Sequence, residues 1–95
     1  LAASQFTGEN LWELPLYAPY EESLRSPIAD FANASGLGDG IKSALFLQHF
    51  VGEIPWAHLD IGSPSYCEKE TRPDVPFGGT GVGVRTLAKW LESLK

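Results

Sequence analysis

His58 and Asp60 are the residues whose types and spacing are best suited to chemistry, because they stand two positions apart in the stretch Trp-Ala-His-Leu-Asp-Ile. In an extended strand, residues two apart point to the same face, so these side chains would lie together. Histidine and carboxylate ligands occur in zinc sites, but a structural site needs four ligands and a catalytic site about three. The other histidine, His49, falls in a helix predicted to be buried. Two ligands are too few for a metal site, so we interpret the pair as structural.

Cys67, Asp30 and Asn33 are weaker candidates. Cys67 could act as a thiol nucleophile beside a histidine, but it stands in a proline-rich loop and nothing in the sequence brings a histidine to it. Asp30 and Asn33 stand among apolar residues, where they could line a site or cap backbone groups at a helix end. A single cysteine excludes an internal disulfide, which suits a reducing compartment.

Two glycine-rich stretches precede predicted helices and could in principle cradle phosphate. The first, at 36–40, lacks the lysine of a P-loop and follows no strand, as a dinucleotide-binding fingerprint would require. Asp39 is the predicted N-cap of the helix that follows it. The second stretch, at 78–81, is explained by Thr80 as the N-cap of the last helix. We therefore interpret both stretches as turns.

The composition excludes several classes of partner. Seven basic and twelve acidic residues give a net charge of −5, which repels phosphate backbones and argues against nucleic acid as a partner. No apolar run is long enough for a membrane span, so we expect no membrane partner. Hydrophobic residues make up 43% of the chain, so it is not disordered by composition. The N-terminus lacks an initiator Met and a signal peptide, which predicts a start within a longer parent.

The elements that must position these residues are helices around a single strand. We expect the last turns of a helix over 1–6, a short helix over 21–25 with Pro19 near its first turn, and a proline-containing loop over 62–77. The apolar pattern predicts a helix over 41–51, a strand over 56–61 and a last helix with apolar positions Val84, Leu87, Leu91 and Leu94. The helix over 41–51 is apolar on nearly every side and needs a partner or further domain to cover it. One strand cannot make a sheet alone, so we predict an α/β fold of which this chain is one βα unit.

Several blocks, taken in order, are more specific than any single motif. They are Thr7-Gly8-Glu9, Leu11-Trp12-Glu13-Leu14-Pro15-Leu16, Ser43-Ala44-Leu45-Phe46-Leu47, Trp56-Ala57-His58-Leu59-Asp60-Ile61, Gly79-Thr80-Gly81 and Val84-Arg85-Thr86-Leu87. This ordered set closely resembles the end of the leucyl (cytosol) aminopeptidase family, and the resemblance covers residues 1–95. It implies that the chain is the C-terminal segment of an α/β, helix–sheet–helix, metallo-aminopeptidase catalytic domain.

The resemblance also implies an activity. In the family, two divalent metal ions, zinc or manganese, activate a bridging water that removes the N-terminal residue of a peptide, and six subunits form a hexamer in the cytoplasm. The family's metal ligands and catalytic arginine belong to a stretch that precedes the part resembled here. We therefore expect no catalytic residue and no metal ligand within 1–95, no metal bound by this segment, and no activity from it alone. His58 and Asp60 match the family's motif without being metal ligands in it.

What the resemblance assigns to this chain is part of a substrate-pocket wall. Ala34, Gly62 and Ser65 fall where residues lining the pocket for the first side chain of the substrate occur in the family. The chain departs from the family's usual pattern by having Gly62-Ser63 in place of Ala-Gly. The loop after a predicted strand is also where ligands bind in open α/β sheets.

Three interpretations follow from the sequence. The first is a piece of an aminopeptidase whose partner is the remainder of that enzyme or another copy of the chain. The second is a stand-alone binding or assembly module that keeps the fold without catalysis. The third is a small enzyme with its own site, which the lack of ligands disfavours. The apolar helix over 41–51 favours the first, because an independent module should cover such a helix.

Overall fold

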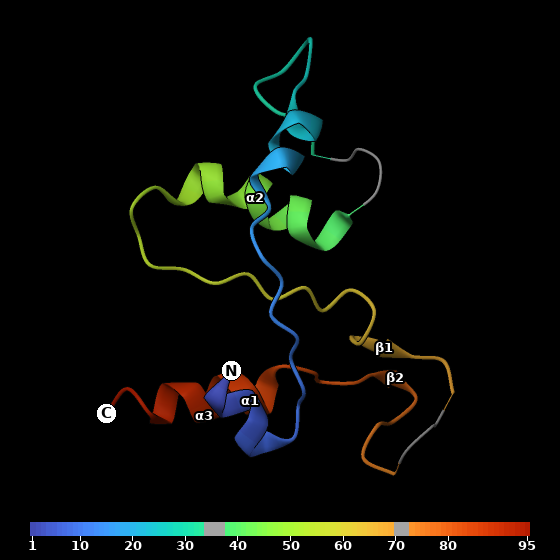
Figure 1. Ribbon diagram of the computed structural model, residues 1–95. Helices are drawn as coiled ribbons and strands as arrows, with labels where there is room; N and C mark the ends of the chain where they lie inside the picture. Colours follow the sequence, from blue (N-terminus) through green and yellow to red (C-terminus); the bar gives the residue numbers. More distant parts are fainter. Residues whose placement is uncertain (34–37, 70–72) are drawn as a thin grey trace. The chain divides into compact units, whose positions relative to one another are not determined.

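The computed structural model describes residues 1–33, 38–69 and 73–95 (Figure 1). The chain divides into two compact units, which we describe separately. The first unit comprises Leu1–Glu13 with Asp60–Lys95, and the second comprises Leu14–Leu59. Within the described ranges, no helix combines the length and the apolar character that crossing a membrane requires.

The first unit pairs the two ends of the chain. Helix α1 (Ala2–Thr7) ends at Gly8, whose φ of 72° is left-handed and suits glycine. Helix α3 (Val84–Glu92) lies beside α1 (Figure 1). Strands β1 (Tyr66–Cys67) and β2 (Gly78–Gly79) form a short antiparallel ladder in which Tyr66 faces Gly79 and Cys67 faces Gly78. The ladder lies within and just after the stretch predicted to be a loop.

The contact between α1 and α3 is polar and is organised by one carboxylate. Glu9 is 9% exposed, and its Oε2 accepts hydrogen bonds from the Thr86 backbone N–H at 2.9 Å and from the Thr86 hydroxyl at 2.7 Å. Arg85 Nε donates to the other carboxylate oxygen at 3.3 Å. Thr86 stands in the first turn of α3, where backbone N–H groups have no partner within the helix. Glu9 therefore caps α3 from the opposite end of the chain.

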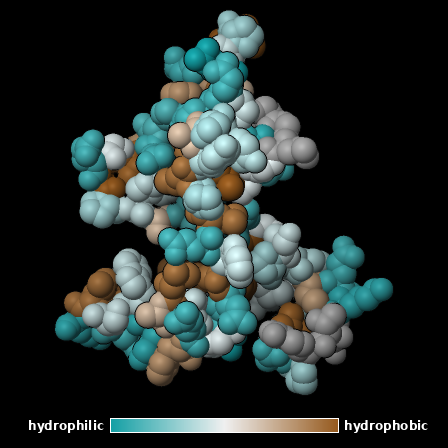
Figure 2. Space-filling view, viewed as in Figure 1, coloured by the Kyte–Doolittle hydropathy of each residue, from teal (hydrophilic) through white to brown (hydrophobic). Residues whose placement is uncertain are grey.

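This arrangement turns the apolar side of α3 away from α1. The four apolar positions predicted for this helix are largely exposed in the described structure: Val84 is 65%, Leu87 45%, Leu91 56% and Leu94 63% exposed. Brown, apolar atoms accordingly reach the surface in the region of α1 and α3 (Figure 2). The predicted amphipathic helix is confirmed, but it presents its apolar side outward and its polar side inward.

The predicted N-cap of α3 is wrong. The N-cap is Gly83, with a left-handed φ of 88°, and not Thr80. Gly81 also has a positive φ, of 68°, so the chain bends between Thr80 and the helix. The Thr80 side chain instead bonds to a segment that precedes it in sequence by 16 positions.

The second unit is a 3-10 helix packed on an α-helix. Helix η1 (Ala18–Leu24) contacts helix α2 (Asp39–Val51), and Leu24 and Leu45 are each 3% exposed. The N-cap of α2 is Gly38 and not the predicted Asp39, which is the first helical residue. Gly38 has a φ of 86°, and a Cβ there would lie 2.9 Å from the Tyr20 ring. Only glycine satisfies both conditions.

Helix α2 is buried on one side only, in contrast to the expectation of full burial. Leu45 is enclosed, whereas Phe50 is 67% exposed. The rings of Phe31, Phe46 and Phe50 form a cluster with centroid distances of 5.2 to 6.3 Å. The helix is apolar on nearly every side, but this unit supplies too few side chains to cover it.

The strand predicted over 56–61 is not formed. These residues have no helix or strand assignment, and their backbones make no ladder in the described structure. Alternation of apolar and polar residues is typical of a half-buried strand. A strand forms, however, only where a neighbouring strand shares its backbone hydrogen bonds. The prediction failed because the sequence of the segment says nothing about whether that neighbour is present.

We predict that Glu9 makes the first unit sensitive to acid. The hydrogen bond from the Thr86 hydroxyl lowers the pKa of Glu9, the Thr86 N–H and Arg85 lower it further, and desolvation opposes them. Because the folded-state pKa lies below the unfolded value, the stabilisation is complete above the unfolded pKa and is lost as the pH falls through the folded one. Glu9→Gln should flatten the fall in unfolding free energy, measured with urea, between about pH 6 and about pH 3.

Glu13→Gln is the matched control, since Glu13 is exposed in the same unit. It should keep the wild-type pH profile. If Glu9→Gln keeps that profile as well, the carboxylate of Glu9 does not stabilise the fold in the way its contacts indicate.

Candidate functional site

Gly62 and Ser65, two of the three residues predicted to line a pocket, lie on one tight turn. The Ser65 N–H donates to the Ile61 carbonyl at 3.0 Å, and the Ser65 hydroxyl donates to the Gly62 carbonyl at 3.1 Å. The Gly62 N–H donates to Asp60 Oδ1 at 3.0 Å. The structure therefore brings these two residues together at the surface of the first unit. Ala34, the third, lies outside the described residues.

The turn is attached to the segment before α3 by Thr80. The Thr80 hydroxyl donates to the Pro64 carbonyl at 2.6 Å, and the Thr80 N–H donates to the Ser65 carbonyl at 3.0 Å. Sequence analysis assigned Thr80 to helix capping and missed this role. The only sequence signal available was a hydroxyl in a glycine-rich stretch, which capping explains equally well.

His58 and Asp60 do not form the pair that their spacing suggested. The Asp60 carboxylate accepts the Gly62 N–H, and the His58 ring lies beside Trp56, at a centroid distance of 6.4 Å. No group of three or more His, Cys, Asp or Glu side chains within the described ranges could hold a metal ion. His58 and Asp60 do not supply the set of ligands that a two-metal centre needs, so neither is assigned a role in metal chemistry.

The Cys67 side chain is hydrogen-bonded to the backbone. Its thiol donates to the Lys69 carbonyl at 2.6 Å, and the side chain is partly exposed in β1. A nucleophilic cysteine needs a base within hydrogen-bond reach. The Lys69 carbonyl that this thiol contacts is a hydrogen-bond acceptor but not a base. The geometry therefore favours a cysteine without a catalytic role.

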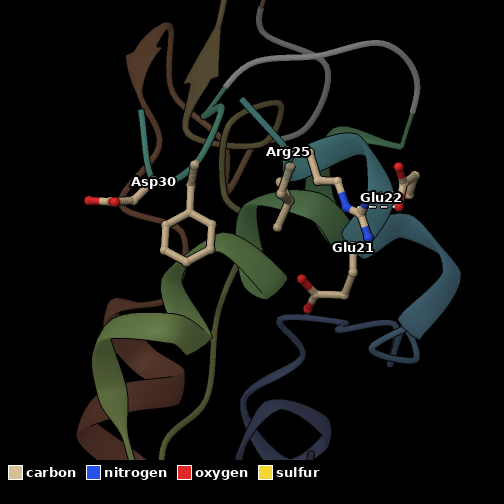
Figure 3. Close-up of a pocket in the computed structure, with 6 residues that line it drawn as sticks. Glu21, Glu22, Arg25 and Asp30 are labelled. Carbon is tan, nitrogen blue, oxygen red and sulfur yellow. Dashed lines mark ion pairs between the residues drawn. The ribbon is translucent and has the colours of Figure 1, made fainter. Parts of the chain in front are cut away.

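A charged cavity of about 240 Å³ lies in the second unit. Its wall is formed by Glu21, Glu22, Leu24, Arg25, Asp30 and Phe31 (Figure 3). Arg25 and Glu22 form an exposed ion pair at 3.0 Å, drawn as a dashed line in Figure 3. Asp30 thus lines a cavity, which was one of its two predicted roles. Neither Gly62 nor Ser65 contributes to this wall.

His49 is more accessible than its predicted position in a buried helix implied. Its side chain is 34% exposed, and its Nε2 lies 3.0 Å from Glu21 Oε2. The ring stacks on Phe31 at a centroid distance of 4.2 Å. Two partners therefore hold this histidine against the wall of the charged cavity. A wall with this many charges suits no apolar side chain of a substrate.

Comparison with known proteins decides the family. The sequence profile of the cytosol aminopeptidase family, catalytic domain, matches residues 1–88. This chain belongs to the cytosol aminopeptidase family. Curated relatives include a probable cytosol aminopeptidase of Geobacter sp. (strain M21), 54% identical over 86 residues, which are 90% of this chain and 17% of that protein. Another, from Synechococcus elongatus, is 47% identical over 94 residues, or 98% of this chain and 19% of the relative.

Solved structures agree with the cytosol aminopeptidase assignment. A structure described as the bottromycin maturation enzyme BotP in complex with Mn matches with a TM-score of 0.90 and 49% identity, over 98% of this chain and 21% of that one. A second structure of BotP matches equally well. The predicted family and the α/β fold class are thus confirmed. The chain spans about a fifth of the length of the relatives it matches.

We predict that the turn tolerates a small side chain at Gly62, the position where the family resemblance led us to expect alanine. A Cβ at Gly62 would lie 3.3 Å from Asp60 Oδ1, and its φ is not in the left-handed region. Because that oxygen ends an exposed side chain, it can shift by a few tenths of an ångström. Gly62→Ala should therefore change the unfolding free energy by less than about 1 kcal/mol, as measured by urea titration.

Gly81→Ala is the contrasting variant in the same unit. A Cβ there meets no atom within 4 Å, but its φ of 68° is strained for any other residue. It should destabilise by about 1–2 kcal/mol. Equal changes in unfolding free energy for Gly62→Ala and Gly81→Ala would show that the backbone at one of these glycines differs from the conformation described.

Proposed function

We propose that this chain is the C-terminal segment, residues 1–95, of the catalytic domain of a leucyl aminopeptidase that removes N-terminal residues from peptides. The observation that carries the proposal is the family match over residues 1–88. In this proposal the segment supplies part of the substrate-pocket wall and of the core. The proposed location is the cytoplasm and the proposed assembly is the family's hexamer.

The proposed wall is formed by Gly62 and Ser65, with Ala34 as its third member. Gly62 has no side chain, and the Ser65 hydroxyl is directed back to the Gly62 carbonyl. The turn therefore offers a substrate mostly backbone and small groups, and the polar hydrogens of Gly62 and Ser65 are already used within the turn. Such a surface suits the apolar first side chain of a leucyl peptide, because a buried apolar group needs no hydrogen-bond partner.

The catalytic metals are proposed to be held by the other part of the domain. Two divalent ions, zinc or manganese, would supply an activated water and stabilise the developing oxyanion. The manganese complex of the structurally similar BotP supports manganese. The contribution of this chain is to bind and orient the substrate's first side chain, which requires no metal ligand from it.

The proposed partner is the remaining, larger part of the aminopeptidase domain. Two apolar faces support this: the outward positions of α3, and the side of α2 that bears Leu47 and Phe50, which are 42% and 67% exposed. Exposed apolar patches of this kind mark contact surfaces. Relatives have about four fifths of their length beyond the matched region, which is enough chain to cover both faces.

We predict that activity requires both parts together. This chain would be co-expressed with the N-terminal part of the Geobacter sp. (strain M21) relative, truncated where the 86-residue match begins. Release of leucine from a leucyl peptide would be measured with manganese or zinc and then with a chelator. We expect metal-dependent release from the co-purified complex and none from either part alone, because neither part holds both the metals and the pocket wall.

Three outcomes would contradict the proposal. Activity of the chain alone would show that it has its own catalytic site. A stable complex without activity, or a monomer that does not associate, would favour the alternative of a non-catalytic assembly or binding module derived from this fold. Native mass spectrometry of the same samples separates association from activity.

We predict that the outward side of α3 is part of the docking surface. Leu91→Lys should change the stability of the chain alone by less than about 0.5 kcal/mol, because Leu91 is already 56% exposed. Fully burying a leucine is worth about 1.5–3 kcal/mol, and about half of Leu91 is left to bury, so the affinity for the N-terminal part should fall about 4- to 20-fold. Glu92→Gln is the control on the same helix and should leave that affinity unchanged. Equal affinities of all three proteins would place the contact elsewhere.

A further inference from the structure

We infer that Thr80 is a positioning residue for the proposed pocket wall: through two hydrogen bonds it fixes the turn that carries Gly62 and Ser65. The inference rests on the proposed function and deepens it, because it names a residue that controls specificity without touching the substrate. The evidence lies entirely within the first unit.

Thr80 is bonded to two consecutive residues of the turn. Its hydroxyl donates to the Pro64 carbonyl at 2.6 Å, and its N–H donates to the Ser65 carbonyl at 3.0 Å. The hydroxyl also accepts the Val82 N–H at 3.3 Å, so both its donor and its acceptor capacities are used. Attachment at two consecutive carbonyls fixes the orientation of the peptide between them as well as its position.

The bond to Ser65 continues the β ladder. Tyr66 faces Gly79 in the antiparallel pair, so Ser65 and Thr80 are the next residues along the two strands. The ladder thus ends at the turn, and the Thr80 hydroxyl extends the attachment by one more residue, to Pro64. Proline has no N–H, so its carbonyl is the only backbone group through which it can be held.

The opposite end of the turn is fixed independently. Asp60 accepts the Gly62 N–H at 3.0 Å, and Ile61 accepts the Ser65 N–H at 3.0 Å. The turn is therefore closed within itself, and the two bonds of Thr80 attach it to the segment that leads into α3. Loss of the hydroxyl would free the Pro64 carbonyl, which water can solvate at this exposed site, so stability should change little while the wall moves.

The test compares Thr80→Val with Thr80→Ser in the complex of the two parts. Valine keeps the shape of threonine without the hydroxyl, and serine keeps the hydroxyl. We would measure kcat and KM for peptides that begin with leucine or alanine. One neutral hydrogen bond corresponds to about a 3- to 10-fold change, which Thr80→Val should show as a higher KM for the leucyl peptide.

The kcat of Thr80→Val should stay within about twofold, because the reacting groups lie elsewhere. Its leucine-to-alanine preference, as a ratio of kcat/KM, should fall with the rise in KM. Thr80→Ser should restore KM and preference to within about twofold of the wild type. A purely structural role would reduce the amount of complex and leave this ratio unchanged.

Each outcome decides a separate question. An inactive wild-type complex overturns the proposed function and the role of Thr80 together. An active wild-type complex with an unchanged preference in Thr80→Val overturns only the role of Thr80. If Thr80→Val does not assemble, Thr80→Ala is measured in the same way, and failure of both to assemble assigns Thr80 to stability and overturns the inference.

Discussion

The buried carboxylate of Glu9 determines how the first unit is built. It accepts two hydrogen bonds from Thr86, which stands 77 positions away in the sequence. A carboxylate is costly to bury without partners, so the side of α3 that bears Thr86 has to face it. The apolar side of the helix is consequently turned outward. The orientation of α3 follows from a polar requirement, which overrides the usual burial of the apolar face.

The exposed apolar faces of α2 and α3 can be related to the greater length of the relatives. A helix that shows its leucines to solvent is poorly stabilised by its own chain, and α2 repeats the pattern with Phe50. The chain spans about a fifth of the length of each relative. Exposed apolar faces are what a segment of a larger α/β domain would present. The polar contacts within each unit fix its local structure, and the exposed apolar side chains of α2 and α3 contribute little burial to it.

Local patterns predicted the helices, and non-local contacts account for the failures. The break at Gly8 located the end of α1 and the apolar pattern located α2 and α3, because a helix satisfies its backbone within a few residues. The strand over 56–61 is not formed because no strand in the described ranges lies beside it to share a ladder. Glu9 and Thr80 were missed as organising residues since their bonds join positions 77 and 16 residues apart. For the site, the ordered motifs placed Gly62 and Ser65, and the structure puts both on one turn, whereas the role of the turn as a pocket wall is still a prediction.

The β1–β2 ladder has a consequence for how the family can vary. The pairing of Cys67 with Gly78 closes the chain at the base of the intervening segment, and Ser65 and Thr80 lie on the far side of that closure. Because loop closure costs little more for a longer loop, insertions and deletions between the two strands are tolerated thermodynamically. The length of that segment can therefore change at little cost in folding free energy while the ladder keeps Ser65 beside Thr80.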